Sequence, residues 1–172
     1  MNRRSWLLSF AAASTLLVGA CEPQPKPASE AAVPALTGAW RSDVQFRTGA
    51  FAAIKDLQFM YVFNLGGTMT ESSNYDGSPP VPPAYGAWKQ IGANEFEAHY
   101  EFYVTAPPKG ISEITGGGGW LPTGRGSLVE RITLAADGKS FQSTIRYAQL
   151  AKDGKPTEAG GEATGRAVRI GI

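Results

Sequence analysis

The sequence has little of the chemistry on which most enzyme sites depend. It contains one cysteine, Cys21, and one histidine, His99. A single cysteine cannot form a disulfide within the chain, and a single histidine excludes metal sites that need two imidazole ligands. The charge is also nearly balanced, with 16 basic against 15 acidic residues and a net charge of +1, so we expect no nucleic-acid partner.

The common nucleotide-binding and catalytic motifs are also missing. The glycine-rich stretch "TGGGGWLPTGRG" at residues 115–126 contains no G-x-G-x-x-G, and its one G-x-x-x-x-G is followed by Arg125 and Gly126 instead of lysine and a hydroxyl residue. Neither G-x-S-x-G nor S-x-x-K occurs in the chain. We therefore expect no cofactor and no metal, and the sequence identifies no catalytic residues.

No apolar run is long enough to cross a membrane comfortably as a helix. The longest covers residues 6–20, which is 15 residues against the roughly 20 needed to span a bilayer. It follows a positively charged start, Met1-Asn2-Arg3-Arg4, and ends in small residues before Cys21. This order is typical of a secretory signal, which we predict over residues 1–20, with a membrane anchor as the alternative.

The residues around the cysteine add a more specific indication. Val18-Gly19-Ala20-Cys21 resembles the lipobox of bacterial lipoproteins. The resemblance implies cleavage before Cys21, lipidation of this residue, and attachment to a membrane in the bacterial cell envelope. Because Glu22 and not aspartate follows, it also implies the outer membrane, facing the periplasm, if the cell is Gram-negative. Loss of residues 1–20 would leave 14 basic against 15 acidic residues, a net charge of −1.

The lipidated cysteine is followed by a segment with little that could pack. Residues 22–35, "EPQPKPASEAAVPA", contain four prolines and no aromatic residue. We predict that residues 21–35 form an extended tether, although a proline-rich docking motif is an alternative. The remaining residues, 36–172, are enough for one domain with a substantial core.

Alternating polarity runs through this domain. In "EFEAHYEFYV", residues 95–104, the apolar side chains at even positions would share one face of a strand, and Glu97, His99 and Glu101 the other. We interpret this second face as a solvated surface and not as a metal or acid–base site. Similar runs cover residues 38–46, 57–65, 68–74, 85–91, 126–135, 139–151 and 162–172.

About eight strands joined by short turns predict an all-β fold, a single antiparallel up-and-down barrel, because closure removes exposed sheet edges. Between the first two strands, residues 47–56 suggest a short helix, since Ala50, Phe51 and Ile54 recur at helical spacing. Residues 106–125 form the longest predicted connection, of a length that is usually functional or disordered.

The tripeptide Gly-Ala-Trp occurs twice, at residues 38–40 and 86–88. Glycine at the start of a strand lets another backbone pass close, and the indole two residues on points to the same face. Here the chain resembles the lipocalin-like, or calycin, barrels, in which a Gly-x-Trp on the first strand packs beneath an arginine. The resemblance implies Trp40 for the first role and Arg166 or Arg169 for the second.

Charged residues interrupt two rows that we predict to face inward. Glu130 stands among Leu128, Ile132 and Leu134, and Arg166 precedes Val168 and Ile170. Buried charges are costly unless paired, so the two predict either an internal pair with nearby hydroxyls or a polar contact for a ligand. The predicted ligand-binding residues are Trp40, Tyr61, Phe63, Tyr100, Phe102, Glu130, Tyr147 and Arg166.

These features leave three functions open. The first is binding or carriage of a small apolar or amphipathic molecule in the barrel lumen. The second is an enzyme of cyclase or isomerase type in which Glu130 and a tyrosine move a proton. The third is a non-catalytic interaction module whose barrel is filled by its own side chains. The sequence specifies neither the ligand nor an oligomeric state.

Overall fold

The structure is a computed structural model that describes residues 34–74, 83–116, 119 and 121–171. The predicted signal segment, the lipidation site Cys21 and nearly all of the tether lie outside these residues, so they stay predictions. In the part of the chain that the structure describes, no helix combines the length and apolar character needed to cross a bilayer.

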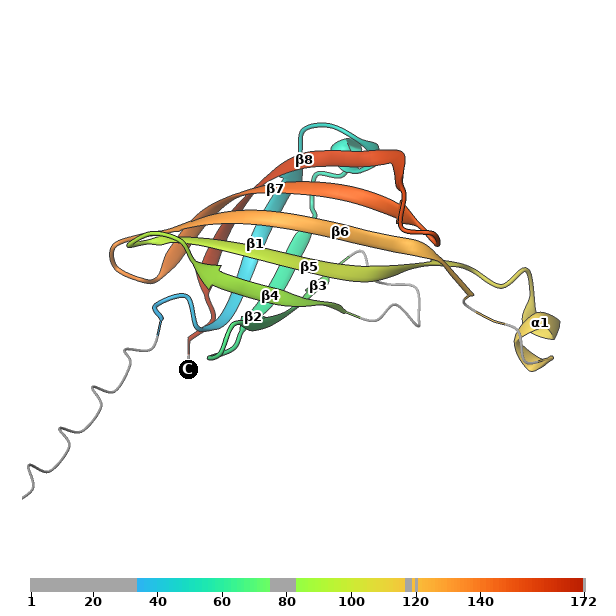
Figure 1. Cartoon of the computed structure of the whole chain (residues 1–172), viewed down its shortest axis with the longest axis horizontal. Coiled ribbons are helices and arrows are strands. Elements are labelled where there is room, and N and C mark those ends of the chain that lie inside the picture. The colour runs from blue at the N-terminus through green and yellow to red at the C-terminus, as the bar shows by residue number, and fades with distance from the viewer. Residues whose placement is uncertain (1–33, 75–82, 117–118, 120, 172) are drawn as a thin grey trace, which may run out of the picture. The chain divides into compact units, whose positions relative to one another are not determined.

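The described residues form eight strands that close into one antiparallel barrel (Figure 1). Each strand pairs with the next, and the last pairs with the first over Trp40–Phe46 and Ala163–Arg169. The predicted all-β barrel is confirmed. The strands are β1 (Gly38–Phe46), β2 (Gln58–Phe63), β3 (Thr68–Ser73), β4 (Ala84–Gln90), β5 (Glu95–Ala106), β6 (Leu121–Leu134), β7 (Ser140–Ala151) and β8 (Pro156–Arg169).

Alternation in the sequence becomes an inside and an outside of the barrel. On β5, Phe96 and Tyr100 are fully buried, whereas Glu97, His99 and Glu101 lie on the outer face. There Glu97 makes ion pairs with Lys89 at 3.3 Å and Arg131 at 3.0 Å. Glu97, His99 and Glu101 thus lie on the outer surface, as we interpreted them, and the ion pairs of Glu97 are an addition from the structure.

Two short helices accompany the strands. A 3-10 helix, η1 (Ala50–Ala53), lies between β1 and β2, where the sequence predicted a helix. The second, α1 (Ile111–Thr115), lies in the connection after β5 and was not predicted. This connection is shorter than expected because β6 begins at Leu121 and not at Gly126, and β8 similarly begins at Pro156 instead of Glu162.

Glycines account for the missed strand starts. Gly124, Gly160 and Gly161 suggest loops when read as sequence, yet they lie inside strands, as does Gly126, where the predicted strand began. At Gly126 a Cβ would lie 2.2 Å from the ring of Phe102, so the missing side chain makes room for an aromatic ring on the neighbouring strand. A glycine that admits a neighbouring ring is compatible with a strand.

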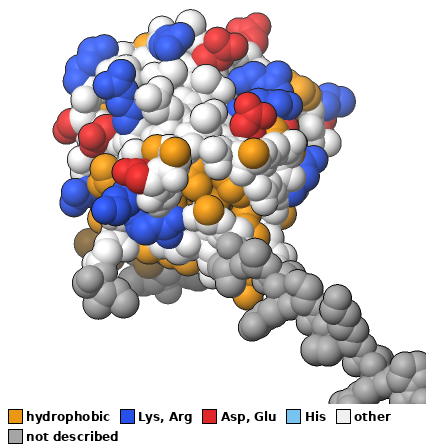
Figure 2. Space-filling model, turned by 90° about the vertical axis from the view of Figure 1, so that its left-hand side faces the viewer, with side chains coloured by type: hydrophobic (Ala, Val, Ile, Leu, Met, Phe, Trp, Pro, Cys, Tyr) orange, Lys and Arg blue, Asp and Glu red, His pale blue; other side chains and the backbone are white. Residues whose placement is uncertain are grey.

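The two ends of the barrel differ. At what we call the closed end, short turns at residues 64–67, 91–94 and 135–139 join neighbouring strands, and residues 34–37 lie beside the end of β8. At the opposite, open end lie η1 and the extended ends of β5 to β8, which run on past the other strands toward α1 (Figure 1). Figure 2 views the closed end, where basic and acidic side chains are interspersed.

Candidate functional site

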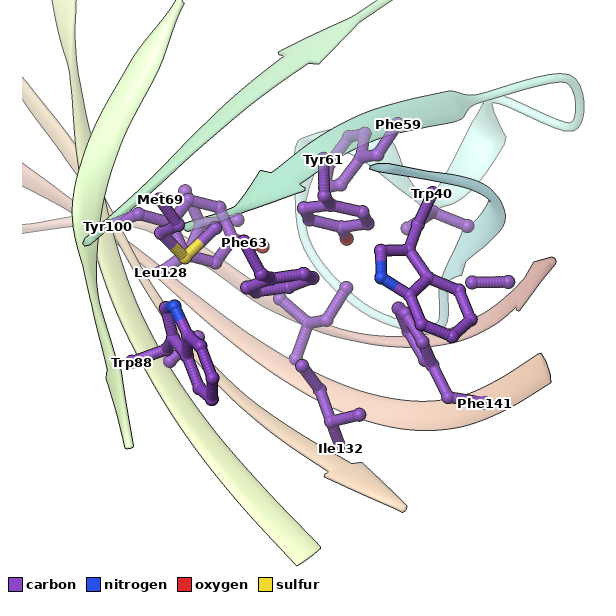
Figure 3. Packing of buried hydrophobic residues seen from close by; sticks show 14 of the residues in the cluster. Trp40, Phe59, Tyr61, Phe63, Met69, Trp88, Tyr100, Leu128, Ile132 and Phe141 are labelled. Carbon is purple, nitrogen blue, oxygen red and sulfur yellow. The ribbon is translucent and has the colours of Figure 1, made fainter. Parts of the chain in front are cut away.

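Aromatic side chains fill the barrel between its closed end and its middle. Trp40, Tyr61, Phe63 and Tyr100, four of the predicted ligand-binding residues, are each at most 1% exposed. The ring of Phe63 lies 5.5 Å from Tyr61 and 5.9 Å from the indole of Trp88 (Figure 3). These four predicted residues are therefore core residues in this structure: Tyr61 packs against Phe63 and Tyr100, and Trp40 packs against Phe141.

The two tryptophans plug the closed end with their polar atoms satisfied. Trp40 Nε1 donates to the carbonyl of Leu36 at 2.9 Å, and Trp88 Nε1 donates to those of Asn64 at 3.2 Å and Thr68 at 3.1 Å. A buried indole needs such an acceptor, so each Gly-Ala-Trp supplies both a bulky plug and a satisfied N–H.

Arg169, and not Arg166, lies over the first tryptophan. Its guanidinium carbon is 4.1 Å from the centre of the Trp40 ring, within the range of a cation–π contact. The same guanidinium donates to the carbonyls of Gly138 at 2.9 Å, Thr37 at 2.8 Å and Ala35. Arg169 therefore ties the segment before β1 to the turn before β7.

The two glycines of the repeated tripeptide have different neighbours. A Cβ at Gly86 would lie 2.1 Å from the carbonyl oxygen of His99 on β5, so a backbone does pass close there. At Gly38, whose φ is +133°, the close neighbour is instead the guanidinium of Arg169, at 2.6 Å. The backbone explanation holds for the second tripeptide, while the first glycine leaves room for the arginine.

In the middle of the barrel, Glu130 is 0% exposed and receives hydrogen bonds from two tyrosines. The hydroxyl of Tyr100 donates to its Oε2 at 2.9 Å, and that of Tyr61 to its Oε1 at a longer 3.4 Å. Burial raises the pKa of Glu130, although contacts with the hydroxyls of Ser143, Tyr100 and Tyr61 act in the opposite direction. The desolvation favours the neutral acid.

The hydroxyls nearby fit a neutral carboxyl. A protonated Glu130 has one O–H to donate, and Ser42 and Ser143 are buried on the same side, since a Cβ at Gly165 would lie 3.0 and 2.5 Å from their oxygens and 3.9 Å from Glu130 Oε1. Ser143 Oγ makes no well-formed hydrogen bond to another described residue. Its oxygen is thus able to accept a hydrogen bond from this O–H when Glu130 is protonated.

A second buried acid, Glu71 on β3, was missed by the sequence analysis. It is 6% exposed and pairs in register with Tyr61 of β2 and Ala84 of β4. Burial raises the pKa of Tyr61 and of Tyr100 well above the ordinary value, and the negative charges of Glu130 and Glu71 act in the same direction. The alternation of Met69 and Glu71 was the signal that could have revealed it.

The prediction that Arg166 faces inward and pairs with Glu130 was wrong. This side chain is exposed, pairs in register with Asp43 of β1 and Gln142 of β7, and does not meet Glu130. The bulky rings of Trp40, Phe141 and other inward residues fill the interior, which leaves room for only small side chains on β8. The inward row is Ala163, Gly165 and Ala167, instead of the predicted Arg166, Val168 and Ile170.

The open end carries its own aromatic cluster, which we call the mouth cluster: Phe46, Phe51, Phe102 and Tyr147. Phe102 and Tyr147 stack with ring centres 6.1 Å apart, and Phe51 of η1 lies 5.6 Å from Tyr147 and 5.4 Å from Phe46. Phe51 and Phe102 are only partly buried. Two of the four, Phe102 and Tyr147, were predicted, whereas Phe46 and Phe51 were not.

Comparisons with known proteins add no support to the resemblance to lipocalin-like barrels that was noted in the sequence. A scan against protein-family models gives no match, and a search of curated proteins gives none either. The fold is an eight-stranded closed antiparallel barrel, compatible with a lipocalin-like fold. The function of this chain must therefore be inferred from its own geometry.

Proposed function

We propose that the protein is a lipid-anchored protein of the bacterial envelope, of lipocalin-like or calycin descent, whose barrel binds a small apolar or amphipathic molecule at its open end. The Val18–Cys21 motif supports the anchor, and Arg169 over Trp40 supports the descent. A lipid-anchored chain would hold the barrel close to a membrane, where apolar molecules are concentrated.

The mouth cluster is the observation that carries the binding proposal. Rings are already packed at the closed end, whereas Phe51 and Phe102 at the open end keep part of their surface accessible. Partly exposed aromatic rings on a rigid strand framework provide contact area at low conformational cost, as ligand sites commonly require. In this proposal Phe51 lies over the ligand, and Phe102 and Tyr147 stack against it.

A neutral solvatochromic dye, Nile red, tests this site. The full chain with Cys21→Ser, which removes the acylation site, should bind the dye with a blue shift of its emission. Phe102→Ala should weaken binding by about three- to tenfold, the range expected for loss of an aromatic contact. Tyr103→Ala is the matched control, because Tyr103 is the next residue, points outward and is 56% exposed. Equal loss in both variants would contradict the proposal.

Native mass spectrometry of the protein purified from its own cells would identify the natural ligand. We expect a mass excess over the lipidated chain, lost on organic extraction. The ligand should rebind to wild-type protein and bind less well to Phe102→Ala.

The filled interior favours a second candidate, an interaction module that meets a partner with its outer surface. Tyr61 packs against Phe63, Tyr100 and Phe141 in the barrel middle, so a ligand cannot enter there without displacing core side chains. A bare lipidated mass together with no dye binding would favour this candidate.

One observation supports the enzyme alternative, and another opposes it. The raised pKa of Glu130 is the direction that a proton-transferring acid needs near neutral pH. However, the carboxyl is 0% exposed and its oxygens are engaged with Tyr61 and Tyr100. Proton transfer to a substrate would require the rings of the barrel middle to separate first, so the structure supports catalysis less than binding.

A further inference from the structure

The outer wall of the barrel carries a groove that the proposed function does not use. It has a volume of about 660 Å³ and lies over β6, β7 and β8. We call it the arginine groove and define it by Arg47, Arg131 and Arg166 with the hydroxyl and amide side chains between them. These side chains are Thr133, Ser140, Gln142, Thr144 and Thr164.

Strand register explains how these residues come together. Arg131 of β6 pairs with Thr144 of β7, which pairs with Thr164 of β8. One row along, Thr133 of β6 pairs with Gln142 of β7, which pairs with Arg166. Neighbouring strands are about 4.8 Å apart, so each row places an arginine roughly 10 Å from the polar side chain at its other end.

The charge of the groove is not balanced within its walls. Its lining contains three arginines and no carboxylate. Arg131 is paired with Glu97 at 3.0 Å, but neither Arg47 nor Arg166 forms an ion pair with any residue that the structure describes.

The acids nearest in register do not fill this role. Asp43, opposite Arg166 on β1, accepts a hydrogen bond from Gln58 Nε2 at 2.8 Å and lines an adjoining pocket that also includes Thr164 and Arg166 of the groove. Glu162 is opposite Arg146 on β7 and does not line the groove. Two guanidinium groups are thus available to an anion from outside.

We propose that the arginine groove binds the phosphate ester of a small polyol, with the phosphate held by Arg47 and Arg166. Guanidinium groups match phosphate oxygens in paired hydrogen bonds, which favours arginine over lysine at such a site. The volume lies within the usual 300–1,000 Å³ of small-molecule sites and exceeds what one phosphate needs. The hydroxyls of Thr144 and Thr164 and the amide of Gln142 provide partners for the polyol hydroxyls.

The same chemistry has two natural sources, a soluble sugar or glycerol phosphate and the headgroup of a phospholipid. The groove is on the outer wall, whereas the mouth cluster faces the barrel axis. Binding in the groove is therefore independent of the ligand proposed for the open end, and the two proposals can fail separately.

Isothermal titration calorimetry of the full chain with Cys21→Ser, at low salt, tests the groove. Glycerol 3-phosphate should bind, and Arg166→Gln should weaken binding at least tenfold. Arg125→Gln is the control, because Arg125 on β6 is an outward arginine like Arg166 on β8 but lies outside the groove, with its Nε 3.7 Å from Glu101. Phe102→Ala should leave this affinity unchanged. Arg166 is exposed, so its replacement should not alter the thermal midpoint.

Two further arms identify the source and the specificity. Binding to phosphatidylglycerol vesicles that Arg166→Gln abolishes would assign the groove to a lipid headgroup, while binding of glycerol 3-phosphate alone would assign it to a soluble ester. Inorganic phosphate should bind at least tenfold more weakly than glycerol 3-phosphate. The proposal is overturned if neither glycerol 3-phosphate nor the vesicles bind, if Arg125→Gln weakens binding as much as Arg166→Gln, or if inorganic phosphate binds equally well.

Discussion

Glu130 places a carboxyl in an aromatic interior, and its protonation contributes a pH-dependent part of the stability. Burial raises the pKa of this acid above the ordinary value of 4.5. Between that value and the higher pKa of the folded state, the folded protein holds a proton that the unfolded chain has released. This contribution is therefore fully present below pH 4.5 and is lost as the pH rises through the folded-state pKa.

The variant Glu130→Gln lacks this titration and keeps a side chain able to accept from Tyr100. Relative to the variant, we expect the wild type to lose up to about 1.4 kcal/mol of unfolding free energy for each pH unit across that window. Urea unfolding of both proteins at a series of pH values measures the difference. Parallel curves would show that Glu130 titrates in the folded state as it does in the unfolded chain.

A pair of arginines provides a second test at the residue scale. Arg169→Leu removes the contact with Trp40 and three hydrogen bonds to carbonyls, and we expect it to cost about 2 to 4 kcal/mol of stability. Arg166→Leu is the matched change at an exposed position and should alter stability by less than about 0.5 kcal/mol. Chemical denaturation distinguishes the two, and a larger loss at Arg166 would place that side chain inside the barrel after all.

At the scale of elements, the close approach of β4 and β5 depends on Gly86. A methyl group there would lie 2.1 Å from the carbonyl oxygen of His99 and 2.5 Å from Cβ of Tyr100, and neither backbone-bound atom can move alone. We expect Gly86→Ala to cost at least about 2 kcal/mol, as overpacking of a core does.

Gly110→Ala is the control for this change. Gly110 precedes α1, its φ is 178°, and no atom lies within 4 Å of the added methyl. Its thermal midpoint should stay within a degree or two of the wild type, in line with small surface effects. If the two alanine variants had equal midpoints, the β4–β5 pairing at Gly86 would have to be looser than in this structure.

Much of each strand could be predicted from period-two alternation, but strand ends and one strand's orientation could not. Phe96 to Val104 alternates strongly, so β5 was predicted from its own residues. On β8 either of two alternating rows of side chains could face inward. One row is Ala163, Gly165 and Ala167. The other is Arg166, Val168 and Ile170, and its last two members are more apolar than those of the first row. Only the packing of rings from other strands decides that the small residues face inward, and this information is absent from the local sequence.

At the scale of the whole molecule, closure of the barrel could be predicted because eight alternating segments would otherwise leave two sheet edges. The filling of its interior could not be predicted, because this depends on how Trp40, Tyr61, Phe63 and Phe141 interdigitate across strands distant in sequence. The neighbours of Glu130 likewise depend on packing between strands and could be predicted only in part. Glu130 was placed inside correctly, while the partner proposed for it, Arg166, belongs to the outer groove.

We also predict that η1 controls access to the open end. Phe51→Ala removes the ring that covers Phe46 and Tyr147. We expect faster association of Nile red in stopped-flow measurements, with a stability loss of about 1 to 2 kcal/mol because Phe51 is only partly buried. An unchanged association rate would mean that the dye enters elsewhere.

The central claim is that the barrel is filled at its closed end and binds at its open end. Side-chain NMR of the isotope-labelled chain, titrated with Nile red or with the extracted ligand, tests it most directly. We predict that resonances of Phe51, Phe102 and Tyr147 shift, while the indole N–H signals of Trp40 and Trp88 stay fixed. Shifts at the two indoles with none at the mouth cluster would contradict the claim, because they would place the ligand among the rings that this structure shows in contact.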